Sequence, residues 1–193
     1  HEQARLNLDR EVGGRSLAEV SADAKKVWDE QMGRIKVEGG TDEQKKTFYS
    51  CLYRTLLFPR EFYEFDRDDK PVYYSPYDGQ VHDGYMYTDN GFWDTFRAVH
   101  PLFTLVYPEV SERIMQSIVN AYNESGFLPE WASPGHRGCM IGNNSISLLT
   151  DAWMKGIRTF DKDKALEAML HQTQACSEEI SSVGRDGYAE YDR

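Results

Sequence analysis

One stretch in the middle of the chain organises the rest: Tyr87–Arg97, which reads YTDNGFWDTFR. Three polar residues suited to helix capping precede a glycine, and two aromatic residues and a carboxylate follow it. A helix that starts near Gly91 places Asp94 within reach of Arg97 and puts Trp93 on the same side as Arg97. An exposed indole beside a carboxylate suits sugar binding, because the ring covers the apolar face of a sugar while the carboxylate accepts hydrogen bonds from two hydroxyls.

The same stretch also has a purely structural interpretation. Trp93 and Phe96 can be ordinary core residues, and Asp94 and Arg97 can form an ion pair at the surface, since buried aromatic residues are common near helix starts. This stretch alone therefore does not distinguish a sugar-binding site from a packed helix, and evidence from other parts of the sequence is needed.

The overall composition excludes several classes of partner. The 193 residues include 22 basic and 32 acidic side chains, a formal net charge of −10. No basic stripe is present, so neither a nucleic acid nor an anionic membrane surface is expected as a partner. No apolar run approaches the roughly 20 residues of a membrane-spanning helix. The three cysteines, Cys51, Cys139 and Cys176, match no zinc or redox spacing and leave the compartment undecided.

The apolar residues recur mostly at helical spacing, which predicts about six helices and few strands. Two capping boxes mark helix starts, one formed by Ser16 with Glu19 and one by Thr41 with Gln44. Short turns alternate with long loops, as in antiparallel helical hairpins. We therefore predict an all-α fold, either part of an (α/α)6 toroid or a solenoid. The lack of an internal repeat of fixed period disfavours the regular solenoid.

Two long connections, residues 60–87 and 127–144, are expected at the same end of such an array, where loops of this length usually carry function. Together with the central stretch they supply two indoles, two carboxylates and two bases: Trp93, Asp94, Glu130, Trp131, His136 and Arg137. Each also has a structural explanation, as a cap, an ion-pair partner or an exposed loop residue. The acidic run at Asp66, Asp68 and Asp69 lacks the glycine and distal glutamate of a calcium loop, and we predict no metal ligands.

A series of short segments, in order over nearly the whole chain, resembles the exo-acting α-mannosidases of glycoside hydrolase family 92. The segments that carry the resemblance are Val37–Gly40, Thr47–Arg54, Phe92–Arg97 with His100–Leu102, Gly126–Trp131, Cys139–Gly142 and Asp151–Gly156. No single segment would be specific, because trehalase-like toroids carry strings similar to the Trp-Asp-Thr-Phe-Arg element.

The resemblance implies a secreted or periplasmic bacterial hydrolase with an N-terminal β-sandwich followed by an (α/α)6 toroid. It implies calcium-dependent, inverting hydrolysis of terminal α-mannosides, with an α-1,2 linkage expected. On this reading residues 1–40 are a linker and lead-in helix, and residues 41–193 are the first part of the catalytic domain, in a chain truncated at both ends. The partners are a terminal α-mannoside glycan and the remainder of the same polypeptide.

The family's Glu-Gly-Asn-type and Gly-Asn-Asp/Glu-Asp-type segments, which carry its acid, base and main calcium ligands, do not occur in these 193 residues. We therefore expect no catalytic residue in this chain, and we expect the isolated chain to be inactive. Only a sugar-binding role carries over, to Trp93 and Asp94 and, with less support from the motifs, to His136 and Arg137.

Two alternatives remain open from the sequence. A different α/α-toroid glycosidase, related to trehalases or glucoamylases, would place a catalytic carboxylate within these loops, with Glu130 as the candidate. A non-catalytic helical scaffold would instead bind glycan or protein through the aromatic loops.

Overall fold

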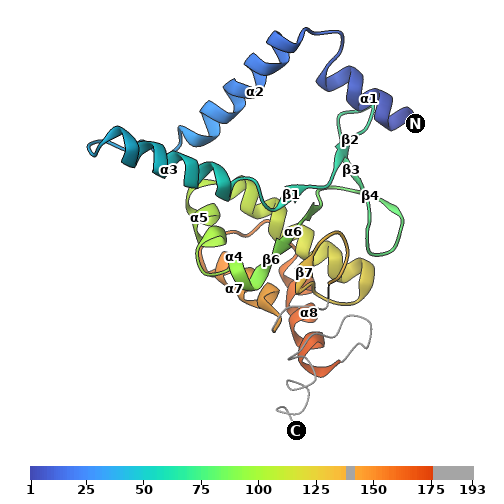
Figure 1. Ribbon diagram of the computed structural model, residues 1–193. Helices are drawn as coiled ribbons and strands as arrows, with labels where there is room; N and C mark the ends of the chain where they lie inside the picture. Colours follow the sequence, from blue (N-terminus) through green and yellow to red (C-terminus); the bar gives the residue numbers. More distant parts are fainter. Residues whose placement is uncertain (138–141, 176–193) are drawn as a thin grey trace. The chain divides into compact units, whose positions relative to one another are not determined.

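The structure is a computed structural model that describes residues 1–137 and 142–175. The chain divides into two compact units. Most of their helices and strands are labelled in Figure 1. Unit 1 comprises His1–Phe58 and Glu64–Pro71, and unit 2 comprises Pro59–Tyr63 and Val72–Arg193. Cys139, Cys176 and the end of the last expected helix lie outside the described residues.

Unit 1 is a set of three helices and one short strand. The helices are α1 (Glu2–Glu11), α2 (Leu17–Met32) and α3 (Asp42–Thr55), and the strand is β2 (Glu64–Phe65). Both predicted capping boxes are confirmed, at Ser16 before α2 and at Thr41 before α3. The Trp28 and Tyr53 rings, 4.7 Å apart, join α2 to α3.

Helix α1 was not expected as a separate helix, because residues 1–40 were assigned to a linker and one lead-in helix. Long-range hydrogen bonds hold it within unit 1. Gln3 and Arg10 both donate to the carbonyl oxygen of Phe65, at 2.8 and 2.7 Å. The pattern of neighbouring residues cannot predict such contacts, because the partners lie far apart in the sequence.

The described residues of unit 2 form five helices and the remaining strands. The helices are α4 (Phe92–Thr95), α5 (Val99–Val106), α6 (Pro108–Ser125), α7 (Asn144–Met154) and α8 (Lys162–Gln174). The strands are β1 (Arg60–Glu61), β3 (Pro71–Tyr74, in this unit from Val72), β4 (Val81–Asp83), β5 (Tyr87–Thr88), β6 (Asn90–Gly91) and β7 (Trp131–Ala132). Antiparallel pairs form between β1 and β5, β3 and β4, and β6 and β7.

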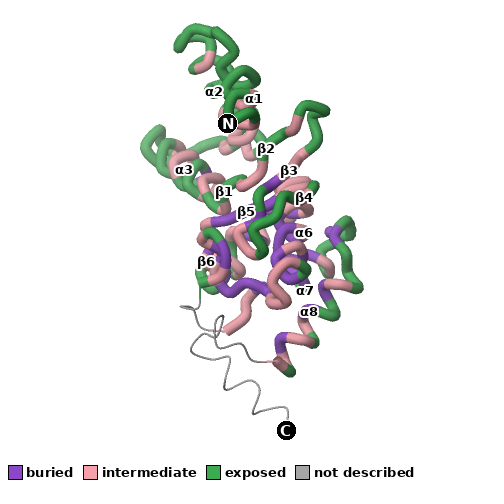
Figure 2. Tube along the Cα trace, turned by 90° about the vertical axis from the view of Figure 1, so that its right-hand side faces the viewer, coloured by how far each residue is buried: buried purple, intermediate pink, exposed green. Residues whose placement is uncertain are grey.

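Helix α6 is the centre of unit 2 and contacts α5, α7 and α8. It begins at Pro108, whose missing N–H needs no partner at a helix start, and it ends at Gly126 with φ +81°. Buried residues gather along it in Figure 2, whereas α1 and α2 are mostly exposed. Its buried set is Ser111, Ile114, Met115, Ser117, Ile118, Val119, Ala121 and Tyr122.

The prediction of an all-α fold was wrong. The described residues form seven short strands in three small sheets as well as eight helices. Each strand is only two to four residues long, so none shows the alternation of apolar and polar side chains that identifies a strand in sequence. The expected long loop at residues 60–87 in fact contains five of the seven strands, at least in part.

Candidate functional site

The central stretch is held in place by the pairing of β6 with β7. In this ribbon Gly91 lies opposite Trp131, although 40 positions separate them in the chain. A β-carbon on Gly91 would lie 2.9 Å from Asp94 Oδ2 and 3.7 Å from the Trp131 ring. The absence of a side chain at Gly91 therefore lets the Asp94 carboxylate and the Trp131 indole approach the same point on the backbone.

Asp94 and Trp131 thus meet at Gly91, and Trp93 directly precedes Asp94 in α4; we call these three residues the platform. The Trp93 side chain is 41% exposed, Asp94 is exposed and Trp131 is half-buried. The Arg97 guanidinium lies 5.0 Å from the centre of the Trp93 ring, and it donates a hydrogen bond to the Trp93 carbonyl oxygen at 2.7 Å. Arg97 is therefore held by Trp93, and within the described residues it forms no ion pair with Asp94.

A buried polar network lies directly behind the platform. The Asn90 amide donates to Nε2 of His100 at 2.9 Å, which assigns the ring proton of the neutral histidine to Nδ1. The Thr95 hydroxyl lies 3.0 Å from Asn90 Oδ1 and 3.1 Å from the Gly91 carbonyl oxygen. Burial lowers the pKa of His100 to about 4, because no charge near the ring offsets the loss of hydration. This network fixes β6 to the start of α5, so the residues between them are presented from a rigid base.

Arg137 lies close to the platform, whereas His136 does not. The backbone N–H of Arg137 donates to the Trp131 carbonyl oxygen at 3.0 Å, and its Nε donates to the Ser133 carbonyl oxygen at 2.9 Å. The exposed guanidinium therefore remains beside β7. His136 Nε2 lies 2.7 Å from the Ser125 hydroxyl, and its ring stacks edge-on against Tyr77 at 4.8 Å.

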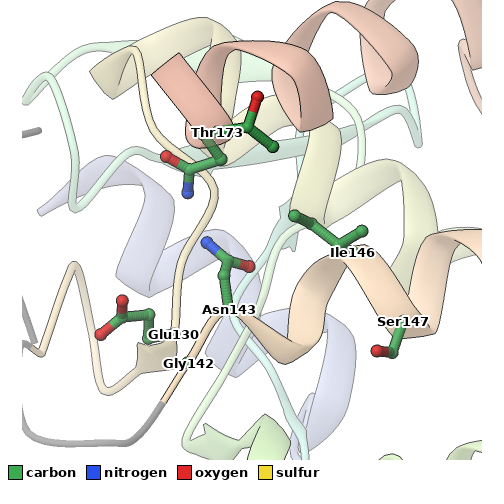
Figure 3. A pocket seen from close by; sticks show the side chains of 7 residues that line it. Glu130, Gly142, Asn143, Ile146, Ser147 and Thr173 are labelled. Carbon is green, nitrogen blue, oxygen red and sulfur yellow. The ribbon is translucent and has the colours of Figure 1, made fainter. Parts of the chain in front are cut away.

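Glu130 occupies a different environment, although it directly precedes Trp131. The residue is only 2% exposed and lines a cavity of about 240 Å³ (Figure 3). Asn143 and Gln172 share this cavity, and both donate to the Leu128 carbonyl oxygen, at 3.4 and 3.1 Å. The structure therefore brings Asp94 and Trp131 together at Gly91, with Trp93 and Arg137 on the same two segments, and places Glu130 and His136 in separate contacts.

The sequence analysis did not single out Gly91 or His100 as functional. Gly91 was expected only near the start of a helix, and its close contacts depend on a strand partner 40 positions away. His100 lies three residues after the stretch Tyr87–Arg97, and the sequence did not show that it is buried.

The sequence did not indicate a further cluster, which lies between the β3–β4 hairpin and α6. Asp78, His82 and Glu124 place possible metal-ligand atoms within 4.8 Å of one another. These groups already bond to one another and to their neighbours. His82 contacts Asp78 at 2.8 Å, and Glu124 accepts hydrogen bonds from the Tyr73 and Ser75 hydroxyls. The cluster therefore has a structural role, since it joins the β3–β4 hairpin to α6.

Exposed indoles, carboxylates and guanidinium groups are side chains that suit carbohydrate binding. Comparison with known proteins identifies the family. The profile of the glycosyl hydrolase family 92 catalytic domain matches residues 3–193, and the chain belongs to this family.

Two solved relatives come from Bacteroides thetaiotaomicron. One, described as a family GH92 inverting mannosidase, is 74% identical, with a TM-score of 0.96 over 99% of this chain and 26% of its own. Another, a family GH92 α-mannosidase in complex with mannoimidazole, is 31% identical, with a TM-score of 0.81 over 92% of this chain and 23% of its own.

A curated relative from Arthroderma benhamiae, described as an uncharacterized secreted glycosidase, is 24% identical over 96% of this chain and 20% of its own length. The chain thus spans about a quarter or less of the proteins that it matches. Among the described residues, no helix combines the length and apolarity required to cross a bilayer.

Proposed function

We propose that this chain is part of the catalytic domain of an inverting exo-α-mannosidase and that its platform binds the terminal mannose ring. The observation that carries the proposal is the family match over residues 3–193, together with 74% identity to a protein described as an inverting mannosidase. The remaining part of the domain is proposed to come from the longer polypeptide, consistent with the share of the relatives that this chain covers.

In this proposal each platform residue has a distinct task. The exposed indole of Trp93 covers the apolar face of the sugar, and Arg97 keeps that ring in position from behind. The carboxylate of Asp94 accepts hydrogen bonds from two neighbouring hydroxyls. Trp131 and the guanidinium of Arg137 border the same space. Sugar-binding roles for Glu130 and His136 remain predictions.

Inverting hydrolysis needs an acid that protonates the leaving oxygen and a base that activates water, roughly 6.5–9.5 Å apart. We assign neither role to this chain. Calcium, which the family implies, prefers a shell of six to eight oxygen ligands. Among the described residues no group of three potential side-chain ligands surrounds Asp94, and the cluster at Asp78 includes a histidine and carboxylates that are already bonded. These residues do not fit a resident calcium ion, so its ligands are proposed to lie elsewhere in the polypeptide.

The decisive experiment is hydrolysis of an aryl α-mannoside by the full-length protein, meaning the polypeptide that contains this chain. Proton NMR of the first product should detect β-mannose, the inverted anomer. Asp94→Asn should lower kcat/KM roughly 10- to 100-fold, because a hydrogen bond to a charged group contributes about 1.5–3 kcal/mol. The matched control is Asp163→Asn, whose side chain is 87% exposed and remote in sequence. An Asp94→Asn enzyme with unchanged kinetics would remove Asp94 from the binding site.

The finer features of the proposal have separate tests. A panel of α-1,2-, α-1,3- and α-1,6-linked mannobioses tests the expected α-1,2 preference.

Chelation with EDTA should abolish turnover by the full-length protein, and added calcium should restore it. The isolated 193-residue chain should not turn over substrate. Fractionation of the producing cells tests the proposed export to the periplasm or medium, which the description of the Arthroderma relative as secreted supports.

A further inference from the structure

The chain passes from one two-stranded ribbon to another at a single residue, Asp89. Before it, Thr88 of β5 lies opposite Arg60 of β1, and after it Asn90 of β6 lies opposite Ala132 of β7. Asp89 has φ +60°, in the left-handed region that residues other than glycine adopt at a cost of about 1–3 kcal/mol. Other contacts must therefore hold this corner in place.

The Asp89 carboxylate supplies these contacts. Oδ2 forms an ion pair with the Arg60 guanidinium, and Oδ1 accepts a hydrogen bond from the Ser133 hydroxyl at 3.2 Å. Arg60 lies on the partner strand of the first ribbon, and Ser133 directly follows the partner strand of the second. The Asp89 side chain is only 13% exposed, so water competes weakly for these bonds. One carboxylate thus ties both partner strands to the corner between them.

The second ribbon carries the platform, because Gly91 and Trp131 are paired in it and Asp94 lies against Gly91. We propose that Asp89 is a positioning residue, which sets the orientation of Trp93, Asp94 and Trp131 toward the sugar without touching it. The proposal rests on the proposed sugar-binding role of the platform.

The chain offers a closely matched control in unit 1. Asp69 has φ +58°, and it also pairs with an arginine, Arg10, at 2.5 Å. Its side chain is 82% exposed, and its contacts belong to unit 1, which holds no platform residue. Asp69→Gly therefore makes the same chemical change at the same backbone conformation, away from the platform ribbon.

The first test is the kinetics of the full-length protein on an aryl α-mannoside. Asp89→Gly relieves the left-handed backbone and removes both carboxylate contacts. We expect kcat/KM to fall about 10- to 100-fold, the range produced by a displacement of about 1 Å at a binding group. Most of the fall should appear as a higher KM, because the platform binds the sugar and does not transfer protons. Asp69→Gly should stay within about twofold of the wild type.

The second test does not depend on turnover. With 5-fluorotryptophan incorporated, the fluorine resonances of Trp93 and Trp131 should shift in Asp89→Gly and remain unchanged in Asp69→Gly. Trp→Phe substitutions assign the resonances. If the wild type hydrolyses no mannoside, the proposed function fails, while the fluorine spectra still decide whether Asp89 orients the platform.

A second variant covers the case in which Asp89→Gly does not fold. The double variant Arg60→Gln with Ser133→Ala removes the same two contacts and leaves Asp89 in place. It should raise KM and shift the two resonances in the same direction as Asp89→Gly. Wild-type KM together with unchanged Trp93 and Trp131 resonances, in either variant, would overturn the proposal.

Discussion

Helices α2 and α6 are nearly equal in length, with 16 and 18 residues, and they differ in almost every other respect. Helix α2 has a complete capping box at Ser16 and Glu19 but no buried residue. Helix α6 has no side-chain hydrogen bond at its N-terminal cap, yet eight of its residues are buried. Local hydrogen bonds thus define where α2 begins, whereas tertiary packing stabilises α6.

This difference matters because most helical stability in proteins comes from packing of an apolar face. A capping interaction contributes about 1 kcal/mol, whereas burial of one large apolar side chain contributes about 1.5–3 kcal/mol. We therefore expect substitutions in the interior of unit 2 to have large effects and substitutions along α2 to have small ones.

The largest effect is expected at Met115, which is fully buried in α6. Met115→Ala should lower the free energy of unfolding by about 2–5 kcal/mol, since it removes buried methylene groups and leaves a cavity. Val27→Ala in α2, where Val27 is 58% exposed, should change it by no more than about 0.5 kcal/mol. Urea unfolding of the full-length protein measures both. A loss at Val27 comparable to that at Met115 would show that the full-length protein covers this face of α2.

The second effect is a pH dependence that arises from His100. In the unfolded chain His100 takes its ordinary pKa of 6.5, whereas burial lowers its pKa to about 4 in the folded state. Between these values the unfolded chain binds more protons, so stability falls as the pH drops from about 6.5 to 4. The free energy of unfolding lost over this range is on the order of 3 kcal/mol, because each unit of pKa corresponds to about 1.4 kcal/mol. Above pH 6.5 the contribution is fully present.

Thermal unfolding at a series of pH values, for the wild type and His100→Gln, measures this contribution as a difference. The ring neighbours of His100 are Phe92 and Phe103, which do not ionise, so the difference reports the histidine itself. Parallel pH profiles for the two proteins would mean that His100 is accessible to protons in the folded state.

A smaller effect is expected at the start of α2. The Ser16 hydroxyl bonds to the Glu19 carboxylate and holds the pKa of Glu19 below its usual range. Ser16→Ala should destabilise the helix by about 1 kcal/mol and raise the pKa of Glu19 toward its ordinary value. Hydrogen exchange in the first turn and an NMR titration of Glu19 measure these changes. Ser16→Thr, which keeps the hydroxyl, should behave like the wild type.

The sequence predicted the features of the fold that depend on neighbouring residues. The caps at Ser16 and Thr41 are both confirmed, because each involves residues within one turn of the chain. The strands could not be predicted in the same way. In the β1–β5 and β6–β7 pairs the partner strands lie far apart in the sequence, and strands of two to four residues are too short for an alternating pattern to be recognised.

The candidate site follows the same division. The character of Trp93 and Asp94 was visible in the quoted stretch, and Trp131 was expected nearby because both long loops were assigned to one end of the fold. The burial of Glu130 was not predicted, since it depends on the packing of its loop against α7 and α8. The corner at Asp89 was read only as a capping residue, because its contacts with Arg60 and Ser133 span 29 and 44 positions.

The smallest effects should separate two ion pairs of the same spacing. In α2, Lys25 precedes Asp29, and the side chains are 74% and 58% exposed; in α7, Asp151 precedes Lys155, and both are 41% exposed. An acidic residue on the N-terminal side of its basic partner is the favourable order, because it agrees with the helix dipole. Double-mutant cycles should give a coupling of about 0.3–0.5 kcal/mol for the α7 pair and a lower value for the α2 pair. Both couplings should decrease in 1 M salt, where the Debye length falls to about 3 Å. Equal coupling energies would show that neither the residue order nor the exposure of these ion pairs affects their strength. The difference between α2 and α6 would then lie only in how many of their residues are buried.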